Sequence, residues 1–112
     1  MNLRAKIWFE LGGEHIFGPG RAALLEAVER EGSIQAAAAK VGLSYRHAWS
    51  MLRASQRRWD RKLIETSRGG VGGGGARLTD AGRALLRAFR RIESGVQKAV
   101  QEQQHELEIA GI

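Results

Sequence analysis

The sequence lacks cysteine, long apolar runs and a recognisable secretion signal. Without cysteine, disulfide bonds and thiolate metal sites are excluded. No uninterrupted apolar stretch approaches the roughly 20 residues that a membrane-spanning helix needs. Residues 1–13 carry Arg4, Lys6 and Glu10 within their apolar run and have no signal-peptide core. We therefore expect a cytoplasmic protein that does not contact a membrane.

Patterns typical of an enzyme or a metal site are also missing. The three histidines, His15, His47 and His105, fall on separate predicted elements, and no two carboxylates are spaced to share a site. There is no nucleophile motif and no His-Glu-x-x-His sequence. We expect neither catalytic activity nor a bound metal or cofactor.

Positive charge is concentrated in one part of the chain. The 112 residues fit a single domain with a net charge of +6. Residues 1–43 hold five basic and five acidic side chains, whereas residues 44–68 hold seven basic and two acidic ones. Such a surplus attracts phosphate polyanions, although a run of charge is often only a solvated helix face. Because the surplus coincides with the docking surface predicted below, we favour nucleic acid as the partner.

Residues 32–59 show the pattern of a helix-turn-helix. Small or apolar residues recur at helical spacing on both sides of Gly42, so that two helices bury one face each against the other. Ser33 and Ser44 each stand in the N-cap position before a helical run. Gly42 lies where the chain reverses, a place that favours a positive φ angle. The pattern is typical of a DNA-binding motif whose second helix, here reaching about Trp59, enters the major groove.

Short elements are predicted before this motif. Residues 6–11 and 14–17 are predicted to form either two short strands or an extended arm, joined by a turn at Gly12-Gly13. A helix then starts at the proline of Gly18-Pro19-Gly20 and stops at Gly32.

A glycine-rich hairpin is predicted after the motif. Strands over residues 62–66 and 76–79 flank residues 67–75, which include six glycines. This connection fits the tip of a β-hairpin wing. A nucleotide-binding loop is the weaker alternative, because the Gly-Lys-Ser/Thr sequence and a βαβ dinucleotide unit are absent.

The last helix is predicted to start at Thr79 as N-cap, with Asp80 at the positive end of the helix dipole. About 28 residues would span about 42 Å, which is longer than the preceding body covers. We expect its apolar stripe to pair with a second copy of the chain; the alternative is a helix that lies across its own domain and frays after Val100. The expected dimerisation residues are Leu85, Phe89, Ile92, Val96, Ala99, Val100 and Leu107.

The expected fold is mostly α with a small β component (α+β). It is a winged helix-turn-helix with a short N-terminal β-hairpin and a long C-terminal dimerisation helix. Residues 1–79 form the winged DNA-binding part and residues 80–112 the linker helix, within one domain.

Contacts with double-stranded DNA are expected mainly from the second helix of the motif. Arg46 is the first candidate for a base contact, because its guanidinium fork can pair with guanine O6 and N7. Tyr45 is expected to touch a thymine methyl or a phosphate, His47 is either a phosphate donor or solvated, and Trp49 is assigned to packing. The expected DNA-binding residues are Ser33, Gln35, Ser44, Tyr45, Arg46, His47, Ser50, Arg53, Arg68 and Arg77.

Three segments resemble the N-terminal domain of the ModE-type molybdate-responsive regulators. They are Gly-Ser-Ile-x-x-Ala-Ala-x-x-x-Gly-Leu-Ser-Tyr-Arg-x-Ala-Trp at 32–49, Gly-Gly-x-Gly-Gly-Gly-Gly-Ala at 69–76 and Leu-Thr-x-x-Gly at 78–82. The layout is also similar to the LysR-type winged helix. The resemblance implies a sequence-specific transcriptional regulator that binds an inverted-repeat operator as a homodimer with paired linker helices. It further implies genes of molybdate transport or molybdoenzymes as targets.

Full ModE proteins continue into small β-barrel domains that bind molybdate. Because this chain ends at Ile112, we expect it to lack that oxyanion site. A separate molybdate-binding protein is then an expected partner.

Other uses of the fold give different expectations. A winged helix can be a protein-docking module, but docking faces are usually richer in exposed apolar residues than this basic region. A non-specific architectural DNA binder would use the same charges without base contacts. RNA binding is less favoured, because aromatic residues on a sheet platform are missing.

Overall fold

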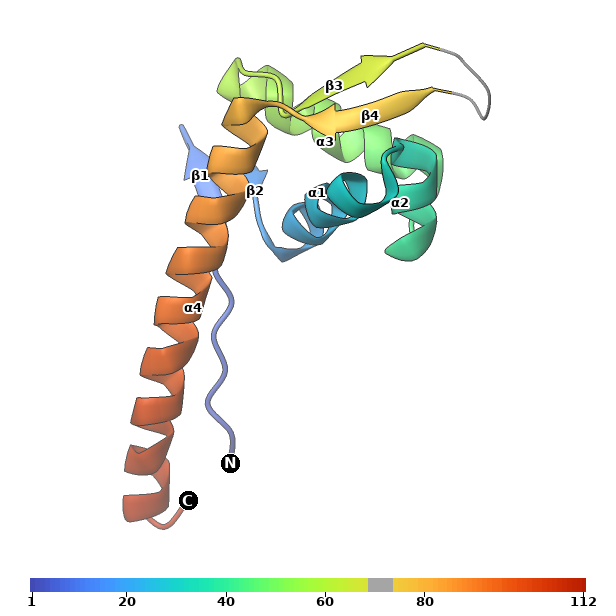
Figure 1. Cartoon of the computed structure of the whole chain (residues 1–112). Coiled ribbons are helices and arrows are strands. Elements are labelled where there is room, and N and C mark those ends of the chain that lie inside the picture. The colour runs from blue at the N-terminus through green and yellow to red at the C-terminus, as the bar shows by residue number, and fades with distance from the viewer. Residues whose placement is uncertain (69–73) are drawn as a thin grey trace.

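The computed structural model describes residues 1–68 and 74–112, which form four helices and two β-hairpins. In Figure 1 the first three helices and both hairpins make up a head, from which the last helix extends as a stalk. The molecule is 60 Å long on its longest axis. This architecture confirms the predicted α+β winged-helix fold. In chain order the elements are β1 (Phe9–Leu11), β2 (Glu14–Phe17), α1 (Pro19–Glu31), α2 (Ile34–Lys40), α3 (Tyr45–Trp59), β3 (Ile64–Ser67), β4 (Gly75–Leu78) and α4 (Asp80–Ile109).

Three helices start at the side-chain caps that the sequence predicts. Ser33 Oγ accepts a hydrogen bond from the backbone N–H of Ala36 (3.1 Å), which caps α2. Ser44 caps α3 and Thr79 caps α4 in the same way, with distances of 3.0 and 2.9 Å. Each hydroxyl satisfies a backbone donor that the first helical turn leaves unpaired. Gly42, in the turn between α2 and α3, has the expected positive φ of 73°.

Phe89 joins the stalk to the head. Its ring lies between Phe9 (5.3 Å between ring centroids) and Phe17 (5.4 Å), both in edge-to-face geometry, and it is fully buried. Such pairs add to the stabilisation from burial alone. The assignment of Phe89 to a dimer surface is therefore wrong, because the side chain belongs to the core of its own chain. The stripe residue Leu85 also packs partly against this core.

The first strand is shorter than predicted. It begins at Phe9 rather than at Lys6, because Phe9 already pairs with Phe17, the last residue of β2. Beyond Phe17 the chain turns into α1 at Gly18, so residues before Phe9 have no strand to pair with. In the second hairpin β4 ends at Leu78, because Thr79 leaves the strand to cap α4. The wing tip was predicted at residues 67–75; Ser67 and Gly75 instead belong to β3 and β4, and residues 69–73 lie outside the described residues.

Residues 1–8 form an arm that runs antiparallel beside the stalk (Figure 1), a contact that the sequence analysis did not anticipate. The side chain of Gln104 donates to the carbonyl oxygen of Met1 (2.9 Å) and accepts from the N–H of Leu3 (2.7 Å). Gln97 donates to the carbonyl oxygen of Ala5 (2.9 Å). The arm therefore covers one side of α4, and the helix continues to Ile109 without fraying at Val100.

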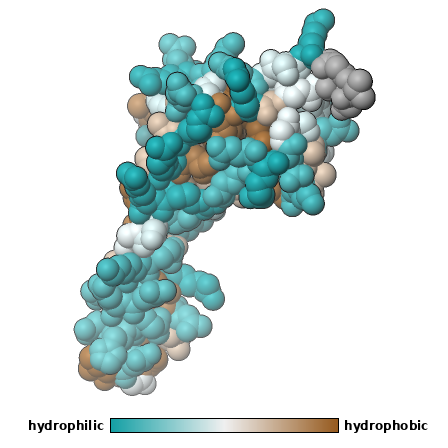
Figure 2. All heavy atoms as spheres, viewed as in Figure 1, coloured by the Kyte–Doolittle hydropathy of each residue, from teal (hydrophilic) through white to brown (hydrophobic). Residues whose placement is uncertain are grey.

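The remaining core fills the head between α1, α2, α3 and the two hairpins. Hydrophilic residues cover most of the visible face in Figure 2, with hydrophobic residues showing between them. An ion pair between Arg90 of α4 and Glu26 of α1 adds a second link between stalk and head. Hydrogen bonding to Glu26 raises the pKa of Arg90, as expected for a guanidinium that donates to a carboxylate. The largest fully buried side chains are Phe17, Phe89, Leu24, Leu25, Leu52, Leu63, Leu78 and Val28.

The first turn of α4 packs so closely on the chain before β3 that only glycine fits at position 82. A Cβ atom there would lie 2.3 Å from the carbonyl oxygen of Leu63. We expect Gly82→Ala to lower the free energy of unfolding by about 1–3 kcal/mol, the usual cost of overpacking. Gly95→Ala is the matched control, because a Cβ there meets no atom within 4 Å and alanine favours the helix. Urea unfolding measures both, and equal stability of the two variants would contradict the close contact.

Candidate nucleic-acid interface

Helix α3 is fixed in the head by polar contacts on both sides. The buried hydroxyl of Ser55 donates to the carbonyl oxygen of Ile16 in β2 (2.6 Å). On the other side, Gln56 Oε1 accepts from the backbone N–H groups of Leu63 (2.9 Å) and Ile64 (3.3 Å) at the start of β3. These bonds satisfy groups that burial would otherwise leave unpaired. They fix the orientation of α3 relative to both hairpins.

The outer face of α3 is open and positively charged. Arg46, Arg53 and Arg57 are exposed, and no carboxylate among the described residues pairs with them. We call these three arginines the α3 basic face. His47 and Ser50, two further predicted contacts, are exposed on the same helix. A shallow hollow along this helix is lined by Tyr45, Arg46, Trp49, Ser50, Arg53, Ala54, Arg57 and Arg58.

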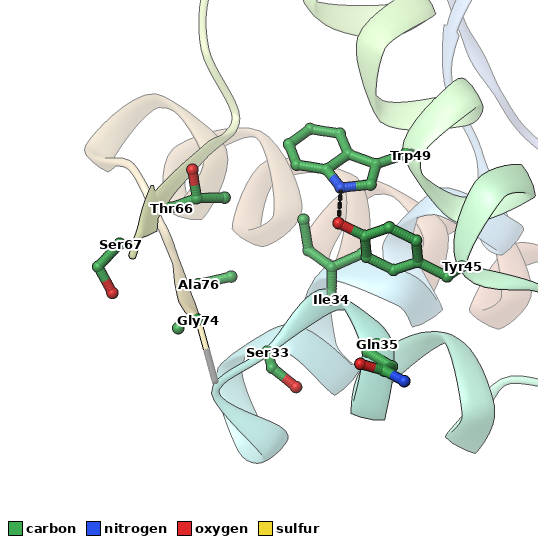
Figure 3. Close-up of a pocket in the computed structure, with 10 residues that line it drawn as sticks. Ser33, Ile34, Gln35, Tyr45, Trp49, Thr66, Ser67, Gly74 and Ala76 are labelled. Carbon is green, nitrogen blue, oxygen red and sulfur yellow. Dashed lines mark hydrogen bonds between the residues drawn. The ribbon is translucent and has the colours of Figure 1, made fainter. Parts of the chain in front are cut away.

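A groove of about 260 Å³ opens between α2, α3 and the wing formed by β3 and β4 (Figure 3). It brings together three of the predicted contacts, Ser33, Gln35 and Tyr45, which lie on two different helices. It also brings in Thr66 and Ser67 of β3, which the sequence analysis did not select. All five side chains are uncharged and carry hydrogen-bonding groups. Ile34, Trp49 and Ala76 also line the groove, so it combines polar groups with an apolar wall beside the α3 basic face.

The two arginines of the wing, Arg77 and Arg68, have different surroundings. Arg77 pairs with Glu65 on the neighbouring strand (3.1 Å), although both side chains are largely exposed and the pair is therefore weak. Arg68 is exposed at the end of β3.

Arg58 of α3 makes a structural contact with the first hairpin. Its guanidinium pairs with Glu14 (3.2 Å) and donates to the carbonyl oxygen of His15 (2.8 Å), which ties the end of α3 to β2. Burial first, and then the charges of Arg21, Arg58 and Lys6, lower the pKa of His15. The lowered pKa favours the neutral form of His15, so this side chain contributes little to the positive field.

The structural residues Ser55 and Gln56 were missed because nothing in the local sequence marks them. Both lie in α3, where the apolar residues alone already predicted the buried face of the helix. The hydrogen-bond partner of Ser55 is 39 residues away in the chain, and that of Gln56 is 7 residues away. Thr66 and Ser67 had one available signal, since they are hydroxyl residues next to a glycine-rich turn.

The described residues contain no cluster of three or more His, Asp or Glu side chains arranged to hold a metal ion. Within the same ranges, no helix has the length and apolarity to cross a membrane.

The family model for bacterial regulatory helix-turn-helix proteins of the LysR family matches residues 21–83. The chain belongs to this family. The matched segment begins in α1, contains α2, α3 and the wing, and ends in the first turn of α4. It therefore includes the α3 basic face and the groove.

Curated relatives confirm the resemblance to ModE-type regulators. The chain is 39% identical over 98 residues to the molybdenum-pterin-binding protein MopA of Rhodobacter capsulatus, covering 88% of this chain and 37% of MopA. It is 42% identical over 80 residues to the molybdenum transport protein ModE of Azotobacter vinelandii, covering 71% and 30%. The DNA-binding transcriptional dual regulator ModE of Escherichia coli K12 is 36% identical over 81 residues, covering 72% and 31%. The chain thus spans about a third of the length of these relatives.

Solved structures share the fold. The structure described as a CbnR_DBD–DNA complex aligns with a TM-score of 0.60 at 24% identity, covering 77% of this chain and 93% of that one. ArgP from Mycobacterium tuberculosis aligns with a TM-score of 0.55 at 24% identity, covering 76% of this chain and 30% of that one. At this identity the likeness establishes the winged-helix architecture alone.

The Gln56 bonds predict how strongly the wing depends on α3. Gln56→Ala leaves the N–H groups of Leu63 and Ile64 without their acceptor, so we expect unfolding free energy to fall by about 1–3 kcal/mol. Gln35→Ala is the control, because Gln35 is exposed at the start of α2. Chemical denaturation measures stability, and amide hydrogen exchange at Leu63 should accelerate in Gln56→Ala only. Unchanged exchange there would contradict the anchoring role.

Proposed function

We propose that this chain is the DNA-binding part of a ModE-type transcriptional regulator and recognises an inverted-repeat operator as a homodimer. The observation that carries the proposal is the α3 basic face, an exposed cationic surface on a helix that is anchored on both sides. Membership of the LysR family of bacterial regulatory helix-turn-helix proteins supports DNA binding as well. A rigid helix with a free cationic face fits the major groove of duplex DNA.

The residues around α3 divide into two kinds of contact. Arg46 lies in the first turn of α3, where helices of this motif meet base edges, so it is assigned to guanine recognition. Arg53 and Arg57 lie further along the helix and are assigned to phosphates, together with Ser33 and Gln35 at the start of α2. Arg68 is assigned to the backbone near the wing, and Arg77 contributes less because Glu65 competes for it.

Helix α4 supplies the dimer surface in this proposal. The side of the helix that faces away from the arm carries an apolar row at three- and four-residue spacing, and Ile92 at its centre is 50% exposed. Val96, Val100 and Leu107 are half-buried, so they border the row rather than form its centre. The row consists of Leu85, Ala88, Ile92, Gly95 and Ala99.

Charge favours an antiparallel arrangement of two such helices. The exposed basic residues Arg87, Arg91 and Lys98 precede the acidic residues Glu102 and Glu106 along α4. An antiparallel pair places each basic segment beside the acidic segment of the other copy, whereas a parallel pair aligns like charges. The dimer then presents two copies of α3 to two half-sites.

A link to molybdate rests on the names of the relatives, which include molybdenum transport and molybdenum-pterin-binding proteins. In this part of the proposal, a separate molybdate-binding protein is the partner that conveys the signal, and molybdate transport or molybdoenzyme genes are the targets. Purification from cells with and without molybdate tests it. A complex whose mass and composition do not change with molybdate would contradict such a partner.

Selection of bound sequences from random duplex DNA, followed by titration at two salt concentrations, tests the function directly. An enriched inverted repeat with salt-sensitive affinity supports the proposal. Salt-sensitive binding without an enriched sequence would contradict the proposal and indicate a non-specific architectural DNA binder. Absence of DNA binding would contradict it and indicate a protein-docking module.

Replacing Arg46 and replacing Arg68 by alanine should affect DNA binding in different ways. We expect Arg46→Ala to relax the preference at one or two base pairs, at a cost of about 1–3 kcal/mol on the preferred sequence. We expect Arg68→Ala to weaken binding to all sequences alike. Arg4→Ala, which removes the same charge from the arm, is the matched control. If Arg46→Ala lowers affinity with no change of preference, the base contact is wrongly assigned.

Ile92 tests the dimer surface. Ile92→Glu places a charge in the apolar row, so we expect the dimer dissociation constant to rise at least tenfold, by about 1.4 kcal/mol or more. Leu11→Glu is the control, since Leu11 in β1 is similarly exposed at 52% but lies outside α4. Analytical ultracentrifugation over a concentration series measures both. A dissociation constant that is unchanged in Ile92→Glu would rule out this row as the interface.

A further inference from the structure

Trp49 connects two predicted DNA contacts on α3. Its indole Nε1–H donates to the Tyr45 hydroxyl oxygen at 2.7 Å (Figure 3), and the guanidinium carbon of Arg53 lies 5.0 Å from the centre of its ring. Tyr45, Trp49 and Arg53 are four residues apart in sequence, so the three side chains form one row along the helix. Trp49 itself is half-buried and packs against the core of the head.

The hydrogen bond from Trp49 determines what Tyr45 can do. An indole N–H is a donor only, so the Tyr45 oxygen must be the acceptor and the phenolic proton points elsewhere. Among the residues that the structure describes, nothing accepts that proton. Tyr45 is 52% exposed and lines the groove, so the proton is available to a ligand that enters it. Accepting one bond also makes the hydroxyl a better donor in the next.

The surroundings favour an anionic acceptor. The groove side chains Ser33, Gln35, Thr66 and Ser67 are neutral hydrogen-bonding groups, and none of the described residues that line the groove is acidic. Arg53, held over the indole ring, adds a positive charge from the same row. Neutral donors beside a fixed cation suit a DNA phosphodiester, which carries one negative charge and no donor.

We propose that Trp49 is a positioning residue for DNA binding: its indole N–H holds the Tyr45 hydroxyl as a donor to a backbone phosphate, and its ring holds Arg53 beside it. This inference rests on the DNA-binding function proposed above. Trp49 does not touch DNA in this arrangement. It reduces the rotamer freedom that Tyr45 and Arg53 would otherwise lose on binding.

A double-mutant cycle tests the coupling between Trp49 and Tyr45. The probe is a fluorescein-labelled duplex selected by the wild-type chain, and the readout is fluorescence anisotropy. We expect Tyr45→Phe and Trp49→Phe each to weaken binding about tenfold, while Trp49→Phe in a Tyr45→Phe background weakens it much less. Equal losses in both backgrounds would overturn the proposal.

Trp59 provides the matched control. It lies at the end of the same helix with Arg61 5.3 Å from its ring, and it does not line the groove. Trp59→Phe should leave DNA affinity within about twofold of wild type. A loss equal to that of Trp49→Phe would mean that any Trp-to-Phe change in α3 acts through the fold, and the positioning role would be rejected.

Single methylphosphonate substitutions along the duplex test the phosphate contact, because each removes one backbone charge. We expect one position at which the substitution weakens binding by the wild-type chain but not by Tyr45→Phe. If both proteins lose equally at every position, Tyr45 does not contact a phosphate. If the wild-type chain binds no duplex, the proposed function fails together with this inference, whereas binding with an additive cycle overturns the inference alone.

Discussion

The fixed orientation of α3 is the constraint on which the binding surface depends. Ser55 ties the buried side of the helix to β2, and Gln56 ties it to the start of the wing. The Ser55 bond is buried and the Gln56 bonds are partly buried, so an unpaired donor or acceptor at either place would be costly. They orient the helix without using any side chain of the exposed face. Arg46, Arg53 and Arg57 are therefore free to meet a ligand, and the groove between α2, α3 and β3 keeps a defined shape.

The stalk is part of the same folding unit as the head. Phe89 lies between the rings of Phe9 and Phe17, so the first turns of α4 are buried with the N-terminal hairpin. The pair formed by Arg90 and Glu26 reinforces this junction. Beyond it, the arm contacts α4 through Gln97 and Gln104, and the row residues Ile92, Gly95 and Ala99 are exposed. These contacts fix the base of α4 relative to the head, and the dimer proposed above would use this fixed base to set the spacing of its two α3 helices.

Local features of the fold were predictable from the sequence. The caps Ser33, Ser44 and Thr79 and the turn glycine Gly42 depend on residues within four positions in the chain, and all four are observed as predicted. Contacts between distant segments were not predictable in the same way. The burial of Phe89 and the arm alongside α4 join residues 72 or more positions apart, and a helical period of apolar residues does not reveal which neighbour covers them.

The same distinction applies to the candidate site. Exposure of Arg46, His47, Ser50 and Arg53 follows from helical geometry once the apolar face of α3 is known. Arg58 forms an ion pair with Glu14, and Arg77 forms one with Glu65. Both ion pairs depend on the positions of the strands, which the charge pattern of the sequence does not determine. The hydrogen bond between Trp49 and Tyr45 depends on rotamers, which sequence spacing permits but does not determine.

An NMR titration of isotope-labelled chain with a selected DNA duplex tests directly whether α3 is the helix that binds DNA. If it is, backbone amide shifts will concentrate in the first half of α3, at the start of α2 and in the wing strands, with little change in the β1–β2 hairpin. Shifts concentrated on that hairpin or on the arm, with α3 unaffected, would contradict the assignment of α3 as the DNA-binding helix.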